Sequence, residues 1–274
     1  MDAFGDGLAK LGLDLIFREG TELLGGFVLR QVINFGNFVD FTRYTVKQVF
    51  SRPFRSRLIF QQMEFLGNES LMIIMISGFF IGAVFSLEIG FVFKIFGAEG
   101  MMGAASGKAL SRELSPLVTG FLLTGRGGAA ITAEISTMKV NEQIDAMEAM
   151  AVDPVSYLVV PRFIAAVAMT PLLVGVFNFT GQVGSLIVGI FFFDVDQGVF
   201  FGKMTSIVSV VDIFSGLQKA VVFGGLIALM ACRYGLKASG GAKGVGTATT
   251  NSVVVTLLAL LGVDFIITYV QIAL

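Results

Sequence analysis

The sequence predicts an all-α membrane protein in which five transmembrane helices follow an amphipathic N-terminal region. Three observations indicate this fold class. The 274 residues are 55% hydrophobic and only 14% charged, whereas soluble domains carry about a quarter charged residues. The mean hydropathy is +0.84. Apolar stretches approaching or exceeding the roughly 20 residues that cross a bilayer recur along the chain.

Composition also restricts the function. The net charge of −1 disfavours nucleic acid as a partner, because phosphate binding requires a basic surface. The chain has no histidine and one cysteine, Cys232, so we expect no disulfide framework, no metal site and no cofactor bound to this chain. The opening residues, MDAFGDGLAK, do not resemble a secretory signal peptide. We therefore expect the bacterial inner (cytoplasmic) membrane as the location.

The elements follow in order along the chain. Residues 1–66 mix short apolar clusters with charges and predict an amphipathic region lying in the membrane interface. Residues 67–274 form the predicted five-span domain. The second predicted span begins at Leu114 and is interrupted by Arg126. The other spans are Leu71–Leu87, Phe163–Phe193, about Ile213–Cys232, and Ser252–Leu274.

The positive charges predict the orientation, since cytoplasmic loops carry an excess of Lys and Arg. Most basic residues lie before the first span, between the second and third spans, and between the fourth and fifth spans. These three segments lie on one side of the membrane. A cytoplasmic N-terminus and a periplasmic C-terminus follow. The basic residues counted in these segments are Arg43, Lys47, Arg52, Arg55, Arg57, Lys139, Arg162, Arg233, Lys237 and Lys243.

A short acidic amphipathic helix is predicted on the cytoplasmic side, at about residues 140–152. Asn141 suits the N-cap position, and Glu142, Asp145 and Glu148 recur every three residues, with Met147 on another face. Such a helix either lies passively among headgroups or docks in a protein groove. Its acidic face fits anionic lipid poorly, which favours the groove.

Several ionisable residues lie within or beside the predicted spans. Arg112 and Glu113 form either a snorkelling interfacial pair or a polar site in a cavity that engages a headgroup. Lys219 and Asp264 interrupt the fourth and fifth spans. Asp264 is either a structural hydrogen-bonding group or a proton-relay group.

Small residues surround another pair of charges. Arg126 and Glu134 lie in a Gly- and Ala-rich segment that favours close helix packing, as does the GxxxG of Gly78 and Gly82. Arg126 and Glu134 are two turns apart, on roughly one face of a helix. The glycine-rich residues 239–247 lack the phosphate-binding loop pattern and predict a flexible connector.

The central block RELSPLVTGFLLTGRGGAAITAEISTMKVNEQIDAMEAMAVDPVSYLVVPR, with the later ATTNSVVVTLLALLGVDFIITYV, resembles MlaE-type permeases of bacterial ABC phospholipid transport systems. The resemblance covers roughly residues 40–274. It implies a homodimer that associates with a cytoplasmic ABC ATPase dimer, which uses the ATP, and with a periplasmic ring (hexamer) of MCE-domain subunits. Phospholipid transport of this kind would support the asymmetry of the outer membrane.

The resemblance also implies roles for particular residues. Arg112 and Glu113 match the pair that lines the family's lipid cavity, and residues 142–150 match its coupling helix. Independently of the resemblance, the intramembrane polar residues Arg126, Glu134, Lys219 and Asp264 are expected to be structural. Two alternatives remain open, an intramembrane lipid-modifying enzyme using Glu113, Lys108 or Asp264, and a proton-coupled carrier built around Asp264 and Glu113.

Overall fold

The computed structural model describes residues 32–51 and 55–273, and every regular element in these ranges is helical. The chain divides into two units, Met1–Phe50 and Ser51–Leu274. The described part of the first unit is a helix over residues 32–49, within the predicted amphipathic region. The remainder of that prediction, before residue 32, lies outside the described residues. The all-α fold class is confirmed for the described chain.

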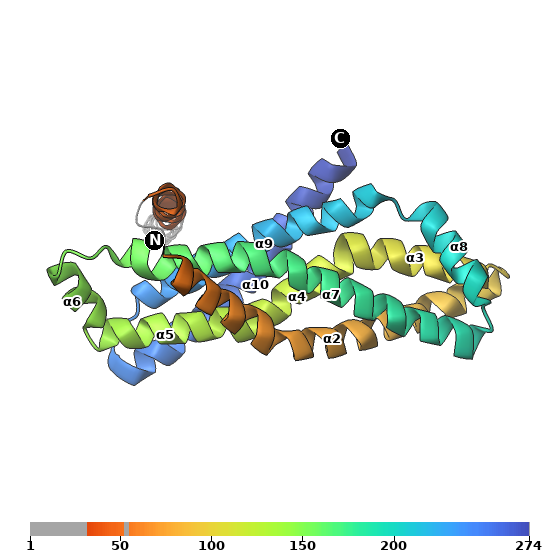
Figure 1. Ribbon diagram of the computed structural model, residues 1–274, viewed down its shortest axis with the longest axis horizontal. Coiled ribbons are helices and arrows are strands. Elements are labelled where there is room, and N and C mark those ends of the chain that lie inside the picture. The colour runs from red at the N-terminus through yellow and green to blue at the C-terminus, as the bar shows by residue number, and fades with distance from the viewer. Residues whose placement is uncertain (1–31, 52–54, 274) are drawn as a thin grey trace, which may run out of the picture. The chain divides into compact units, whose positions relative to one another are not determined.

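The second unit is a bundle of long helices joined by shorter ones (Figure 1). The long helices are α2 (Ser56–Ile95), α7 (Val160–Phe193), α9 (Val210–Leu236) and α10 (Gly241–Ala273). Between α2 and α7 the chain forms α3 (Met102–Ala109), α4 (Ser115–Leu123), α5 (Ala129–Val140) and α6 (Gln143–Ala149). The helix α8 (Gln197–Ile207) connects α7 to α9.

Four helices of the described chain are long and apolar enough to cross a membrane: Ser56–Ile95, Val155–Phe193, Val210–Leu236 and Gly241–Ala273. They contain the first, third, fourth and fifth predicted spans. The second predicted span is not among the four. It lies in a helical run, Met102–Val140, that two π-helical turns interrupt at Leu110–Leu114 and Thr124–Gly128. Polar residues and glycines in this run lower its hydropathy below that of the other spans.

Two helix starts differ from the expectations. The helix α2 begins at Ser56, inside the predicted interfacial region, because residues 56–66 continue the first span as ordinary helix formers. The helix α10 begins at Gly241, so most of residues 239–247 are helical and the prediction of a flexible connector is wrong. Gly240 and Gly241, with φ of +89° and +67°, make the turn itself, a conformation that glycine adopts at low cost.

Small residues allow α2 and α7 to pack closely along their length. A Cβ atom added at Gly82 would overlap the carbonyl oxygen of Gly181, and one added at Gly184 would overlap that of Phe79. The hydroxyls of Ser86 and Ser185 are 2.5 Å apart across the same contact. The predicted packing role of the GxxxG in α2 is therefore confirmed.

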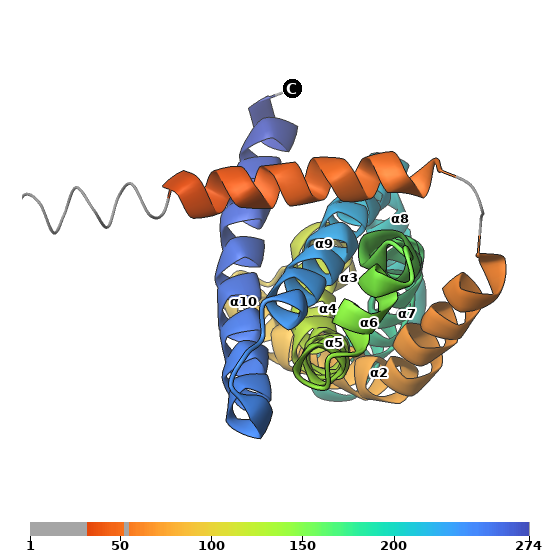
Figure 2. The ribbon, with the colours of Figure 1, turned by 90° about the vertical axis from the view of Figure 1, so that its left-hand side faces the viewer.

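Within the second unit, α7 contacts both α2 and α9, while α5 contacts both α9 and α10. A view along the bundle shows α2 and α10 on opposite sides, with α5 and α9 between them (Figure 2). The connecting helix α6 lies at one end of the bundle and α8 at the other (Figure 1).

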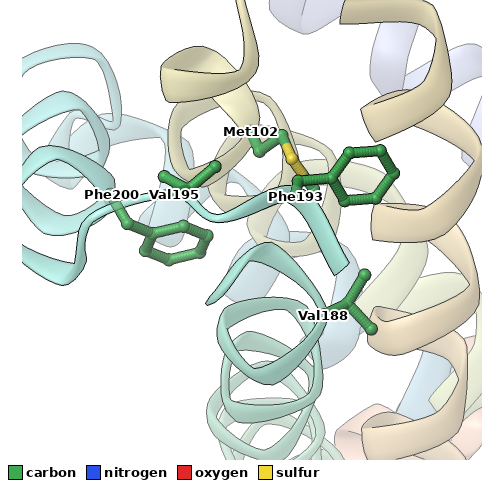
Figure 3. Packing of buried hydrophobic residues seen from close by; sticks show 5 residues of the cluster. All are labelled: Met102, Val188, Phe193, Val195 and Phe200. Carbon is green, nitrogen blue, oxygen red and sulfur yellow. The ribbon is translucent and has the colours of Figure 1, made fainter. Parts of the chain in front are cut away.

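An apolar cluster closes the α8 end of the bundle (Figure 3). Its buried members are Met102, Val188, Phe193, Val195 and Phe200. They come from α3, α7, the loop after it and α8. Burying Phe and Met side chains contributes roughly 1.5–3 kcal/mol each, so this cluster fixes α8 and the start of α3 against α7. It thereby positions the π-helical turn that carries Arg112 and Glu113.

Candidate functional site

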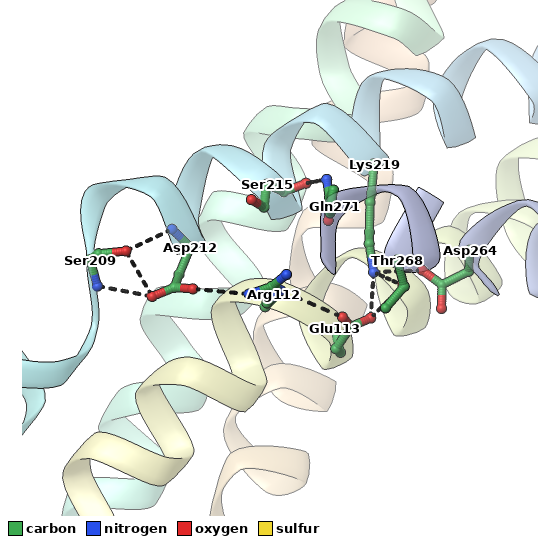
Figure 4. A network of polar contacts seen from close by, with 9 residues as sticks. All are labelled: Arg112, Glu113, Ser209, Asp212, Ser215, Lys219, Asp264, Thr268 and Gln271. Atoms are coloured by element: carbon green, nitrogen blue, oxygen red, sulfur yellow. Dashed lines mark hydrogen bonds and ion pairs between the residues drawn. The ribbon is translucent and has the colours of Figure 1, made fainter. Parts of the chain in front are cut away.

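The candidate site is a cluster of charged side chains between the start of α4, α9 and α10 (Figure 4). Lys219 of α9 lies at its centre and is fully buried. Its ammonium group forms an ion pair with Glu113 and a 3.0 Å ion pair with Asp264 of α10. It also donates a hydrogen bond of 2.7 Å to the hydroxyl of Thr268. An ammonium group has three donors, and here it has three partners.

Arg112 and Glu113 project from the π-helical turn Leu110–Leu114. The Arg112 guanidinium lies 3.5 Å from a carboxylate oxygen of Asp212 and 4.0 Å from one of Glu113. Both separations are longer than the roughly 2.7–2.9 Å of a charge-assisted hydrogen bond. Arg112 therefore keeps donors for a further acceptor. Its side chain is 23% exposed and that of Glu113 is 37% exposed, whereas Lys219 is inaccessible.

Asp212 connects this cluster to the start of α9. It forms a capping box with Ser209, in which each side chain accepts a hydrogen bond from the other residue's backbone N–H, at 3.3 and 3.0 Å. The second oxygen of Asp212 faces Arg112. A single carboxylate thus fixes the beginning of a membrane helix and restrains a cation on the neighbouring segment.

Two members of the cluster were not identified from the sequence. Asp212 carries a readable signal, since a Ser followed three residues later by an acidic residue before an apolar run is a helix-start pattern. Thr268 lies one helical turn after Asp264, so it shares the face of α10 that meets Lys219. Nothing in its local sequence distinguishes Thr268 from the other threonines of α10.

The cluster combines two cations with three carboxylates, an excess of one negative charge. Its buried part, Lys219 with Asp264 and Thr268, is internally paired and joins α9 to α10. Its more accessible part, Arg112 and Glu113, offers a hydrogen-bond donor for a phosphate next to an acceptor for an amine. The arrangement suits recognition of a zwitterionic headgroup better than proton transfer through Asp264, which is ion-paired.

The other predicted intramembrane pair is separated in the structure. Arg126 forms an ion pair with Glu69 of α2 and donates a 2.7 Å hydrogen bond to the carbonyl of Phe65. Glu134 instead forms a 2.7 Å ion pair with the buried Arg162 of α7. The spacing placed Arg126 and Glu134 on roughly one face, and in the structure each forms an ion pair with an opposite charge on a neighbouring helix. Arg126 thus connects the Met102–Val140 run to α2, and Glu134 connects it to α7.

The acidic segment forms α6, which is shorter than predicted. Asn141 ends α5, and the N-cap position of α6 is Glu142, in a left-handed conformation with φ of 59° and no side-chain capping bond. The expected capping role of Asn141 is therefore wrong. Ile144 is buried, whereas Glu142 and Glu148 are exposed. Asp145 accepts a 2.5 Å hydrogen bond from the Lys139 ammonium, and Met147 is half-buried.

The sequence family described as Permease MlaE matches residues 59–270. The intermembrane phospholipid transport system permease protein MlaE of Haemophilus influenzae is 42% identical over 216 residues, 78% of this chain and 82% of its own length. A probable ABC transporter permease protein of Synechocystis sp. is 38% identical, over 77% of this chain and 80% of its own. A Rickettsia typhi protein with the same description is 36% identical, over 90% of this chain and 96% of its own.

Proposed function

The chain belongs to the MlaE permease family, and from this membership we propose that it is the membrane subunit of an ABC transporter that moves phospholipids. The observation that carries the proposal is the Arg112–Glu113 pair beside the buried Lys219. In this proposal Arg112 donates to the lipid phosphate, and Glu113 orients the guanidinium or accepts from an amine-bearing headgroup. Lys219 and Asp264 hold Glu113 in place.

Transport requires an energy source, which we assign to a partner ABC ATPase dimer. The helix α6 is our candidate for the coupling element, because it lies at one end of the bundle between α5 and α7 (Figure 1). Its buried Ile144 anchors it, while Glu142 and Glu148 are exposed for a basic groove of the partner. Nucleotide-driven movement of α6 would bias the bundle between two packings.

We further propose a homodimer in the bacterial inner membrane, with the N-terminus cytoplasmic and the C-terminus periplasmic. In this arrangement the Met102–Val140 run contains the second of the five spans, in addition to the four long apolar helices. Lys139 lies in the last turn of α5, and Lys237 directly follows α9. Both lie at the α6 end of the bundle, in line with the excess of cytoplasmic cations. A periplasmic MCE-domain hexamer would exchange lipid with the proposed site at Arg112 and Glu113 and support outer-membrane asymmetry.

The lipid site is tested by replacing its loosely held cation. Arg112→Ala should reduce lipid transport in vesicles reconstituted with the ATPase, while the dimer still forms and hydrolyses ATP. Lys203→Ala, which removes an exposed cation from α8, is the matched control and should transport normally. Equal transport by both variants would mean that Arg112 does not bind lipid. Arg112 would then only form an exposed ion pair, which contributes about 0–1 kcal/mol to stability.

The coupling assignment is tested by charge reversal on α6. Glu142→Lys with Glu148→Lys should weaken ATPase association without changing membrane insertion, because the new charges repel a basic groove. Glu99→Lys, before α3 at the far end of α2, is the control for charge reversal in general. ATPase binding that survives the double reversal would mean that α6 merely lies in the headgroup layer.

A further inference from the structure

A second feature of the bundle is an open cavity of about 510 Å³ beside the start of α2. It lies toward the α6 end of the bundle, where α2 and α7 both begin (Figure 1), and it shares no lining residue with the charged cluster. Two of its side chains are cationic, and none of the described residues that line it is acidic. The lining consists of Arg55, Ser56, Arg57, Leu58, Gln61 and Tyr157.

The two arginines of the cavity have no anionic partner in the described chain. The ion pairs of the described residues all join other side chains. Arg55 donates to the carbonyl and the hydroxyl of Ser156, at 3.3 and 3.4 Å, and its guanidinium lies 5.1 Å from the centre of the Tyr157 ring. Both hydrogen bonds come from one nitrogen, so among the described residues the other two guanidinium nitrogens have no acceptor. They remain available to a ligand.

The start of α2 adds to the positive potential of the cavity. A helix N-terminus carries a partial positive charge and favours acidic residues, but α2 has Arg55 at the N-cap position and no acidic residue in its first turn. Backbone hydrogen bonding begins with Leu58 and Ile59, which donate to the carbonyl of Arg55 at 3.0 and 3.3 Å. The preceding N–H groups, those of Ser56 and Arg57, have no acceptor within the helix. An anion would stabilise this concentration of positive charge.

We propose that this cavity binds the phosphate of an anionic phospholipid headgroup, as a fixed ligand that is not transported. Arg55 and Arg57 would donate to the phosphate oxygens, since guanidinium groups bind phosphate in bidentate geometry. Gln61 would bind the hydroxyls of a headgroup such as that of phosphatidylglycerol. Cations without a neighbouring acid select a headgroup of net negative charge, whereas the site at Arg112 and Glu113 pairs a cation with an acid.

Exposed aromatic side chains beside the cavity favour a lipid over a soluble phosphate or an acidic protein. Phe60, next to Gln61, is 68% exposed, and Tyr157 is 39% exposed. Aromatic side chains beside cations at the end of an apolar helix are typical of the membrane–water interface. Leu58 gives the lining an apolar side, against which the start of an acyl chain would lie.

A ligand at Arg55 would also act on the junction between α6 and α7. The contacts of Arg55 with Ser156 and Tyr157 connect the start of α2 to the π-helical turn Val155–Val159, which precedes α7. An anion that holds Arg55 in place would restrain this turn, and this regulatory effect rests on the proposed coupling role of α6. Binding itself requires neither Arg112 nor ATP, so a failure to bind would leave the proposed function standing.

Removing one cation from the cavity tests the site. Arg57 is exposed and forms no ion pair with the described residues, so Arg57→Gln should leave the fold intact. Lys243→Gln is the matched control, because Lys243 is an exposed cation in the first turn of α10 and does not line the cavity. Arg55→Gln, combined with Arg57→Gln, removes the second cation of the cavity.

The purified full chain would be equilibrated with dioleoylphosphatidylglycerol in dodecyl maltoside, and bound lipid would be counted by native mass spectrometry. Wild type and Lys243→Gln should retain this lipid better than dioleoylphosphatidylcholine, which has the same chains and no net charge. Arg57→Gln should weaken its retention about fivefold, the effect of one basic residue facing anionic lipid. Any lipid bound at Arg112 is common to all the variants, so the difference reports this cavity.

Two results would overturn the proposal. An equal loss in Arg57→Gln and Lys243→Gln would mean that the lipid is attracted by diffuse charge and not by a site. Unchanged retention in the double variant of Arg55 and Arg57 would mean that the cavity does not hold the lipid.

Two further measurements separate a lipid from other anions. Excess inorganic phosphate should leave the bound phosphatidylglycerol in place, and displacement of the lipid would assign the cavity to a soluble phosphate instead. A photo-crosslinker at Gln61 should give lipid adducts in cells, and these should decrease in the Arg57→Gln background. Adducts with a protein in place of lipid would show that an acidic partner occupies the cavity, and they would refute the lipid assignment.

Discussion

Lys219→Met would test how much of the fold depends on the buried charges of the cluster. The substitution keeps a long unbranched side chain and removes only the ammonium group. It leaves Glu113 and Asp264 without their cation and takes a donor from Thr268. The helices α9 and α10 would then be held together mainly by apolar contacts and by the 3.2 Å hydrogen bond from Gln271 to the carbonyl of Ser215.

The expected cost follows from the burial of the groups. At 3.0 Å and an effective dielectric constant of about 20, one ion pair is worth about 5 kcal/mol before desolvation is subtracted. Removing one partner of a buried pair typically costs about 3–5 kcal/mol. Because Glu113 is 37% exposed, water screens its charge once the cation is gone. We therefore expect a loss of about 3 kcal/mol, arising mostly from Asp264.

The chain itself supplies the assay. Cys232 is its one cysteine and is fully buried in α9, so a thiol-reactive fluorogenic dye reports unfolding during a thermal scan in detergent. A loss of about 3 kcal/mol should lower the melting temperature by roughly 6–12 °C, since chains of 150–250 residues shift about 2–4 °C per kcal/mol. Lys203→Met, on an exposed lysine, should shift it by less than about 1 °C.

A double variant distinguishes the loss of the buried cation from a nonspecific loss of stability. Lys219→Met combined with Asp264→Asn removes the stranded charge and should recover about half of the loss, because contacting residues are not additive. The reasoning is refuted if Lys219→Met melts with wild type, or if the double variant is as unstable as the sum of the two single changes.

Two further predictions concern helix packing and the α5–α6 junction. Gly82→Ala should destabilise the protein by about 1–3 kcal/mol, since its Cβ has no room between α2 and α7, whereas Gly175→Ala should not, and the same thiol assay compares them. The hydrogen bond to Asp145 raises the pKa of the Lys139 amino group, so Asp145→Asn should lower that pKa, measured by NMR of ¹³C-methylated lysines. Because the pKa is raised, the stabilisation from this pair is present below the ordinary lysine pKa and is lost as the pH rises through the folded value; a Lys139 pKa unchanged in Asp145→Asn would contradict the assigned pairing.

The sequence predicted those helices that a continuous run of apolar residues marks. Apolar runs with at most one charge identified four helices that the structure makes long enough to cross a membrane. The end of the second predicted span, which begins at Leu114, was harder to locate. Arg126 and several glycines follow Leu114, and such residues are also common in polar loops. Only the tertiary structure shows why they are tolerated, since the Arg126 charge is neutralised by Glu69 of α2 and the glycines lie in a π-helical turn.

Pairing between distant residues could not be predicted from one sequence. Arg112, Glu113, Lys219 and Asp264 were each identifiable as ionisable residues in apolar surroundings. Their grouping depends on the crossing of α9, α10 and the π-helical turn, which no local pattern encodes. The charge pattern of α6 was readable in the same way, but its short length follows from the left-handed residues Glu142 and Ala151 at its two ends, with φ of 59° each.

The distances of the ionic contacts distinguish the structural cations from the cation that we propose binds the lipid phosphate. Lys219 contacts three acceptors, and Arg126 contacts a carboxylate, a hydroxyl and a backbone carbonyl. Arg112 has only carboxylates at 3.5 and 4.0 Å. A cation that exists to hold helices together is stabilising only when its partners are close, so the loose contacts of Arg112 contribute little to the fold. That same looseness leaves its guanidinium donors available to a phosphate, which is why the lipid site is assigned to Arg112 and its structural support to Lys219.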